Sequence, residues 1–228
     1  MAEGIRRLES SLLSPNLYLL TNADDRVLVD AGTRRGADKI LRQIDEQPPR
    51  VLLLTHVHPP TQGASAQLCR QLGLELWCGA GDELTAATGM TAAAQPRHVT
   101  NRLQQRLLGG PGYPVSRTLH EGDSVVGFVV LEVPGHSPGH IALRREHDRV
   151  LILGDVINGH NVWTMRPGLH EPPRVFTPDP SENRRSAKRL AALRPELVLF
   201  SHGPPLRDPD ALLAFASRLP MRGEHRAR

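Results

Sequence analysis

Short apolar runs recur along the chain and predict a series of strands. Asn16–Thr21 and Arg26–Asp30 predict two strands of a hairpin, with a turn between them. Val51–Thr55 is a continuous apolar run, which is typical of a buried strand. Further strands are expected at Leu74–Cys78, Ser124–Val126, Phe128–Val133, Ile141–Arg145, Val150–Leu153 and Leu197–Phe200.

Helical spacing of apolar residues separates these runs. In Arg35–Asp45, for example, apolar residues recur three and four positions apart until Pro48 and Pro49 stop the pattern. Other helices are expected at Ala64–Leu72, Gly79–Thr88, Asn101–Leu108, Ser181–Leu193 and Pro209–Leu219. The irregular stretch Gly89–Pro114 is interpreted as an insertion over one face, and the Pro- and Gly-rich stretch Asn158–Pro180 as a loop. These patterns predict a single α/β domain over residues 1–228, with helices outside two sheets.

Composition narrows the class of protein. Of the 228 residues, 39 % are hydrophobic, which together with 20 glycines is typical of a globular domain. No apolar run approaches the ~20 residues that span a bilayer, and the N-terminus lacks the apolar region of a secretory signal. Two cysteines, Cys69 and Cys78, cannot form a disulfide framework. We therefore expect a cytoplasmic protein with two free thiols, no membrane partner, and a disordered basic tail over residues 221–228.

The net charge of +4 raises the question of nucleic-acid binding. The basic residues are spread along the chain, and only 4 % of the residues are aromatic, which leaves little for a base-stacking platform. We expect a small-molecule substrate and no nucleic-acid partner.

Metal-capable side chains follow four of the predicted strands. His56 and His58 come after the run at Val51, His136 follows Pro134-Gly135, Asp155 follows Gly154, and His202 follows Ser201. Imidazole and carboxylate ligands suit zinc, iron or manganese, and three protein ligands with an open position make a catalytic site. Any one of these histidines is more simply explained as a strand cap held by backbone hydrogen bonds. Five such residues at four strand ends favour a metal site.

At these residues the chain resembles the metallo-β-lactamase fold superfamily. The matching segments are Leu28-Val-Asp-Ala-Gly32, Thr55-His-Val-His58, Pro134-Gly-His-Ser-Pro-Gly-His140, Gly154-Asp155 and Ser201-His-Gly-Pro204. The resemblance implies a four-layer αββα sandwich. It also implies a first metal site from His56, His58 and His136, and a second site that Asp155 bridges and His202 completes. Asp30 and His140 are then structural residues or support the ligands.

The sequence departs from the family pattern at one place. The family motif runs His-x-His-x-Asp-His, whereas this chain has His56-Val-His58-Pro59-Pro60-Thr61. Proline offers no ligand atom and threonine only a neutral oxygen, so Asp155 and His202 alone are too few for a stable second site. We expect one ion, zinc, at a mononuclear site, with iron or manganese as the alternatives.

These residues lead to a specific functional hypothesis: a metal-dependent hydrolase of an ester, thioester, lactone or related bond that uses a metal-bound hydroxide. Asp155 would hold the hydroxide or take its proton, and His160 is a candidate acid or oxyanion donor, although a lone loop histidine is more often solvated. Trp163, Met165 and Leu169 are candidates for a substrate pocket, but packing of their loop on the body is the simpler explanation.

Two other classes of function remain open. One is a mononuclear iron oxygenase that resembles the persulfide dioxygenases of this superfamily, which retain the Asp and His that are lost here. The other is a degenerate, non-catalytic scaffold or binding protein. The five candidate ligands count against the scaffold, and the iron content of the purified protein would separate the first alternative from the hydrolase.

Overall fold

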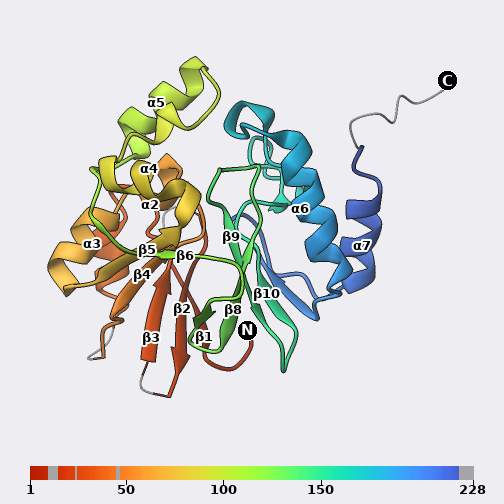
Figure 1. The fold of residues 1–228 in the computed structure, drawn as a ribbon, viewed down its shortest axis with the longest axis horizontal. Coiled ribbons are helices and arrows are strands. Elements are labelled where there is room, and N and C mark those ends of the chain that lie inside the picture. Colours follow the sequence, from red (N-terminus) through yellow and green to blue (C-terminus); the bar gives the residue numbers. More distant parts are fainter. Residues whose placement is uncertain (10–14, 24, 45–46, 221–228) are drawn as a thin grey trace.

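Two β-sheets packed face to face, with helices on both outer faces, form the body of the protein (Figure 1). A computed structural model describes residues 1–9, 15–23, 25–44 and 47–220. The predicted basic tail at 221–228 lies outside the described residues. The four layers confirm the expected αββα architecture, and no helix among the described residues is long and apolar enough to cross a membrane.

The first sheet has six strands in the order of the chain. They are β1 (Ile5–Leu8), β2 (Leu17–Asn22), β3 (Asp25–Val29), β4 (Val51–Leu54), β5 (Glu75–Gly79) and β6 (Val115–Leu119). The predicted hairpin is present, because β2 pairs antiparallel with both β1 and β3. From β3 to β6 the pairing is parallel, so these strands end at the same edge of the sheet. Every residue of β4 is buried, as its unbroken apolar run predicts.

The second sheet has five strands in the order β13-β10-β9-β8-β7. Their bounds are β7 (Ser124–Val125), β8 (Phe128–Glu132), β9 (Ile141–Arg145), β10 (Val150–Ile152) and β13 (Leu197–Leu199). Strands β7 to β10 pair antiparallel, whereas β10 and β13 are parallel. A separate two-stranded hairpin, β11 (Asn158–His160) and β12 (Pro167–His170), follows β10 in the chain.

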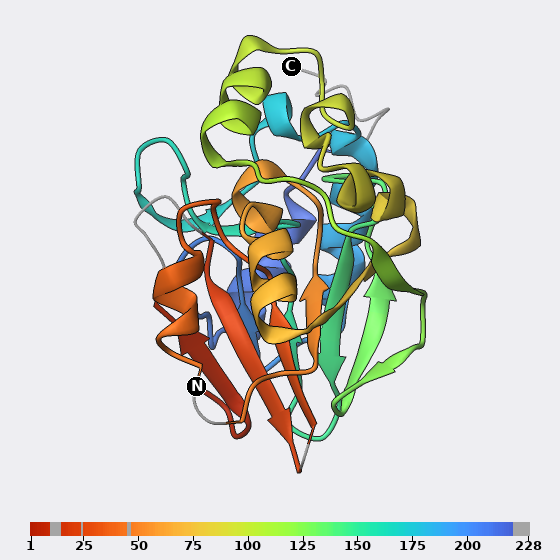
Figure 2. The same cartoon turned by 90° about the vertical axis from the view of Figure 1, so that its left-hand side faces the viewer.

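Helices cover the outer faces of both sheets (Figures 1 and 2). Those in the first half are α1 (Ala37–Leu41), α2 (Pro59–Gln62), α3 (Ser65–Leu72), α4 (Glu83–Thr88) and α5 (Val99–Leu108), with 3₁₀ turns η1 (Ala80–Asp82) and η2 (Thr91–Ala93). The second half has η3 (Arg174–Phe176), α6 (Pro180–Ala192) and α7 (Pro209–Ser217). The helix α5 stands at one end of the molecule, beyond the strands (Figure 2).

The buried apolar residues form three clusters that match these layers. One lies between the sheets and includes Tyr18 and Phe128. A second lies between the first sheet and its helices, and it contains both Cys69 and Cys78, which are free and buried. The third lies beneath α6 and α7 and includes Phe200. Burial raises the pKa of both cysteines to about 12, so neither is a reactive thiolate; their compartment stays a prediction.

Several predicted elements are wrong in extent or were missed. The stretch Asn158–Pro180 is not a plain loop, because it contains β11, β12 and η3. Strands β1 and β6 were missed, since both alternate exposed polar residues with few apolar ones. The predicted helix Arg35–Asp45 ends at Leu41, and two hydrogen bonds between Gln43 and the backbone of Glu9 hold the chain beyond it. The short helix α2 was missed because two prolines suggest a break, although proline fits the first turn of a helix.

Candidate metal centre

The candidate site lies where strands from both sheets end. His56 and His58 stand in the connection between β4 and α2, and His58 is the residue that precedes α2. The other three candidates follow β8, β10 and β13, and they are His136, Asp155 and His202. Two glycines set the paths into this region. A Cβ on Gly135 (φ +128°) would lie 2.1 Å from the backbone nitrogen of Asn183, and one on Gly154 (φ +60°) would lie 2.6 Å from Nε2 of His140.

Three histidines converge on one point. His56, His58 and His136, which we call the imidazole cluster, are buried, and each offers a ring nitrogen within 4.8 Å of the other two. Their ring centroids lie 5.0 Å apart for His56 and His58, 5.0 Å for His56 and His136, and 4.4 Å for His58 and His136. The structure thus brings together the three residues that the sequence suggested as a first ligand set.

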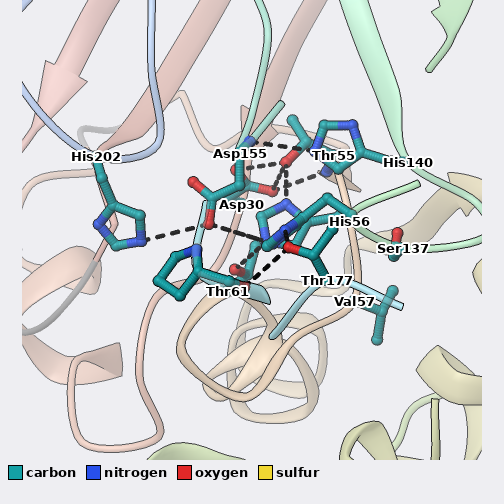
Figure 3. Close-up of polar contacts among 12 residues, drawn as sticks. Asp30, Thr55, His56, Val57, Thr61, Ser137, His140, Asp155, Thr177 and His202 are labelled. Atoms are coloured by element: carbon teal, nitrogen blue, oxygen red, sulfur yellow. Dashed lines mark hydrogen bonds and ion pairs between the residues drawn. The ribbon is translucent and has the colours of Figure 1, made fainter. Parts of the chain in front are cut away.

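Asp155 joins this cluster to His202. Its Oδ2 atom lies 3.7 Å from Nε2 of His56, 3.5 Å from Nε2 of His136 and 3.5 Å from Nε2 of His202 (Figure 3). Burial favours the neutral acid, but the surrounding imidazoles, His202 first among them, hold the pKa of Asp155 well below its usual range. His202 therefore approaches the site through Asp155 and from the side opposite the cluster.

The ring of His56 is oriented by a chain of hydrogen bonds from Asp30. The Thr55 hydroxyl lies 3.0 Å from Nδ1 of His56 and within 3.1 Å of both Asp30 carboxylate oxygens, while the Thr55 amide donates to Asp30 at 2.8 Å. When Asp30 is ionised, the hydroxyl donates to its carboxylate and accepts from Nδ1–H of His56, which leaves the lone pair on Nε2. Burial raises the pKa of Asp30 to about 8, and the Thr55 hydrogen bonds oppose that rise.

Thr177 orients His136 in the same manner. The Thr177 hydroxyl donates to the carbonyl of Pro173 at 3.0 Å and lies 3.1 Å from Nδ1 of His136. Because the hydroxyl proton is committed to the carbonyl, Nδ1–H of His136 donates to the hydroxyl oxygen. The lone pair of His136 is then on Nε2, which faces Asp155.

Asp82 fastens together the two loops that carry the cluster. Its carboxylate accepts from the amide of Val57 at 3.1 Å, the hydroxyl of Ser137 at 2.5 Å and the amide of Gly139 at 3.0 Å. Val57 lies between His56 and His58, and Ser137 follows His136. Burial raises the pKa of Asp82, and these hydrogen bonds oppose the rise.

The imidazole cluster fits a metal ion, because several of its buried polar atoms have no hydrogen-bond partner. Nε2 of His58, Nε2 of His136 and Oδ1 of Asp155 are all buried and have no hydrogen-bond partner. Burial lowers the pKa of His56 and His58 well below the ordinary histidine value, so both are neutral and hold the lone pair that a metal requires. Unpaired buried polar atoms are costly, and a cation among three imidazoles would satisfy them.

Pro60 and Thr61, which replace the Asp and His of the family motif, offer few ligand atoms to a second ion. Pro60 lines the cavity, and the Thr61 hydroxyl lies 3.0 Å from Nε2 of His56. His202 has 17 % of its side chain exposed, compared with 0 % for His56 and 2 % for His136. The candidate second set is thus both smaller and more open than the imidazole cluster.

Two further histidines, His140 and His160, lie near Asp155. Nε2 of His140 accepts from the Asp155 amide at 3.1 Å, and burial lowers the pKa of His140 to about 3, so it is a neutral support. His160, on β11, lies with its ring centroid 6.0 Å from that of His202. Burial, and next the charge of His202, lowers the pKa of His160, which makes it a neutral imidazole at the cavity wall.

A cavity of about 810 Å³ opens over these residues. His58, His136, Asp155, His160 and His202 line it, together with residues of α5, η3 and the β11–β12 hairpin. The expectation that Trp163 and Met165 pack their loop on the body is wrong, because both line the cavity and are exposed. Leu169 instead packs against the core beneath α6 and α7.

Sequence reasoning missed Asp82 and Thr177 and gave Thr55 and Thr61 no role as hydrogen-bond partners. Asp82 follows the end of β5 at the same sheet edge as His56, and an acidic residue at that position is the signal that was available. Thr177 lies in the stretch interpreted as a loop, 41 residues from His136, and nothing in its surroundings marks it.

Comparisons with known proteins agree with this geometry. The family model described as the Metallo-beta-lactamase superfamily matches residues 11–202. Probable metallo-hydrolase YflN of Bacillus subtilis is 28 % identical over 90 % of this chain and 86 % of its own length. Hydroxyacylglutathione hydrolase GloC of Haemophilus influenzae is 26 % identical over 57 % of this chain and 60 % of its own length. A crystal structure of TTHA1623 in a di-iron-bound form is 31 % identical, with a TM-score of 0.70, and the match covers 93 % of this chain and 97 % of that one.

Proposed function

The chain belongs to the metallo-beta-lactamase superfamily, and from this premise we propose that it is a metal-dependent hydrolase of an ester, thioester, lactone or related bond. The observation that carries the proposal is the imidazole cluster, three buried and converging histidines at the wall of an open cavity. The names of the similar relatives, metallo-hydrolases and hydroxyacylglutathione hydrolases, support the same reaction class.

His56, His58 and His136 would hold the metal, with Asp155 beside them. When bound, the metal supplies Lewis acidity, which lowers the pKa of water to ~7 in favourable sites and polarises a carbonyl oxygen. We propose one ion per chain, because Pro60 offers no ligand atom and Thr61 offers only a neutral hydroxyl oxygen. Zinc suits three imidazoles. Iron is the alternative, because the similar protein TTHA1623 has been crystallised in a di-iron-bound form.

Asp155 would hold the attacking water or take its proton. Its Oδ1 atom is buried and has no partner, while Oδ2 lies among three imidazoles. The low pKa of Asp155 keeps the carboxylate ionised, which favours accepting a hydrogen bond from the water over taking its proton. His160 is neutral and can donate one N–H to a substrate oxygen in the cavity.

Elemental analysis combined with a substrate panel tests this function. The purified protein is expected to contain metal and to hydrolyse at least one member of a panel of chromogenic esters, thioesters and lactones. Chelation should abolish the hydrolysis and added zinc should restore it. Metal-free protein with full activity would contradict the proposal, and so would metal-loaded protein that is inert towards the whole panel.

A further inference from the structure

One side of the cavity is apolar. We call it the apolar wall, and its members are Leu108, Val162, Trp163, Met165, Pro173 and Phe176. Trp163 is 60 % exposed and Met165 is 53 % exposed, although large apolar side chains normally gain free energy by burial. They are two of the eight large apolar residues that the described part of the chain leaves exposed.

The apolar wall begins beside the imidazole cluster. Phe176 directly precedes Thr177, whose hydroxyl lies 3.1 Å from Nδ1 of His136. The ring centroid of Trp163 lies 5.5 Å from that of Phe176, so the two rings extend the wall outward from the cluster. On the other flank, the Asn101 side chain on α5 donates to the carbonyl of Val175 at 2.7 Å and holds η3 against α5.

The loop that carries Trp163 is ordered by its own hydrogen bonds. Oδ1 of Asn161 accepts from the amides of Trp163 and Thr164, both at 3.0 Å, and the carbonyl of Asn161 accepts from the amide of Met165 at 2.8 Å. Met165 has φ +57°, a left-handed conformation that residues with a β-carbon seldom adopt. The loop therefore holds two apolar side chains in the cavity at some conformational cost, and such cost is common at functional sites.

Polar residues line the cavity as well. Arg7, Asn16 and Lys39 are among them, and Lys39 lies 3.5 Å from Glu9 in an ion pair. A substrate in this cavity would thus meet both apolar and polar surroundings.

We propose that the apolar wall binds an aliphatic or aromatic chain on one side of the scissile bond, so that the substrates are amphiphilic esters or thioesters. This inference rests on the proposed function for its scissile bond, but the binding of the chain can be measured without turnover. The chain can belong to the acid or to the alcohol half of the substrate, and two series of probes distinguish these sources.

Trp163 can report binding directly, because the protein has only two tryptophans. Trp77 lies on β5, donates to Glu75 at 2.9 Å, packs against the core between the sheets and is outside the cavity lining. Trp77→Phe keeps an aromatic ring at that position and leaves Trp163 as the single tryptophan. We would titrate this variant with straight-chain carboxylates from butanoate to decanoate, and in parallel with the alcohols of the same lengths.

The expected result is a saturable shift of Trp163 emission to shorter wavelength. In at least one series, Kd should fall about two- to four-fold per methylene, as expected for burial of each group. By calorimetry, Trp163→Ala should flatten this dependence, and Asn161→Ala should weaken it, whereas Trp77→Phe should match the unmodified protein. An affinity independent of chain length in both series would overturn the inference, as would an unchanged dependence in Trp163→Ala.

The outcomes separate this inference from the proposed function. Chain-length-dependent binding by a protein that hydrolyses nothing would support the apolar wall and contradict the hydrolase. Hydrolysis of short and long esters with equal KM, together with flat binding, would support the hydrolase and contradict the apolar wall.

Discussion

The two halves of the candidate metal centre differ in how their side chains are held. In the imidazole cluster, His56 and His136 each donate Nδ1–H to a threonine hydroxyl that is itself anchored, by Asp30 in one case and by the Pro173 carbonyl in the other. The rings that would bind a metal are therefore oriented by hydrogen bonds even without the ion.

The other half consists of Asp155 and His202, beside Pro60 and Thr61. His202 is partly exposed, and the Thr61 hydroxyl lies 3.0 Å from Nε2 of His56. A metal site depends on the hydrogen bonds that support its ligands as well as on the identity of those ligands. From it we infer that one half holds an ion and the other half assists the chemistry.

The largest expected effect follows from removing a ligand of the imidazole cluster. His136→Ala should lose both metal and activity, because it deletes a buried imidazole that no neighbouring side chain replaces. Elemental analysis and a hydrolysis assay would measure the two losses together. His147→Ala, at a histidine with 74 % of its side chain exposed, is the matched control and should change neither. Full activity in metal-free His136→Ala would refute the account of this half.

A smaller loss is expected when the support of a ligand is removed while the ligand stays. Thr177→Val keeps the side-chain shape but removes the hydroxyl that accepts from His136, and loss of such a partner typically weakens metal affinity about 10- to 100-fold. Competition with a chromogenic chelator would measure this affinity. Thr177→Ser retains the hydroxyl and should stay close to the unmodified protein; equal affinity in the valine and serine variants would show that the hydrogen bond has no such role.

A substitution at His160, whose ring lies beside that of His202, tests the role of the second half of the centre. His160→Gln should lower kcat about ten-fold, the typical worth of one hydrogen bond to a substrate, and should leave metal content unchanged. Steady-state kinetics on the best substrate of the panel would give the value. An unchanged kcat would identify His160 as a surface residue, and a loss of metal would make it a ligand.

The smallest change is expected when the Asp and His of the family motif are restored, and it concerns the number of metal ions per chain. The double variant Pro60→Asp with Thr61→His should raise metal content from about one toward two ions per chain, because a carboxylate and an imidazole would join Asp155 and His202. The single variants serve as controls and should stay near one. A well-folded double variant that still binds one ion would show that the path of the loop, and not ligand identity, decides metal number.

The fold was largely predictable because its central strands are apolar and continuous. The runs at Val51–Leu54 and Val150–Ile152 are buried along their whole length, and their ends carry His56 and Asp155 as expected. The edge strand β6 and the hairpin of β11 and β12 escaped prediction because exposed polar residues, glycine and proline remove the apolar signal.

The convergence of the three histidines was predictable from the sequence, but the residues that support them were not. Histidines at strand ends are conspicuous in a sequence, whereas the role of Thr177 arises only from a contact across 41 residues. Asp82 likewise accepts hydrogen bonds from Val57 and Ser137, which are distant from it in the sequence, so no local sequence pattern predicts these contacts. Supports of this kind depend on tertiary structure, and so does the position of Trp163 in the cavity.

The number of metal ions in the unmodified protein tests the central claim most directly. Native mass spectrometry of protein loaded with excess zinc or iron and then desalted would count the ions that remain per chain. We predict one tightly held ion per chain, bound by His56, His58 and His136. Two tightly held ions per chain would contradict it, because the half that contains Pro60 and Thr61 would then hold metal without the ligands that the family motif provides.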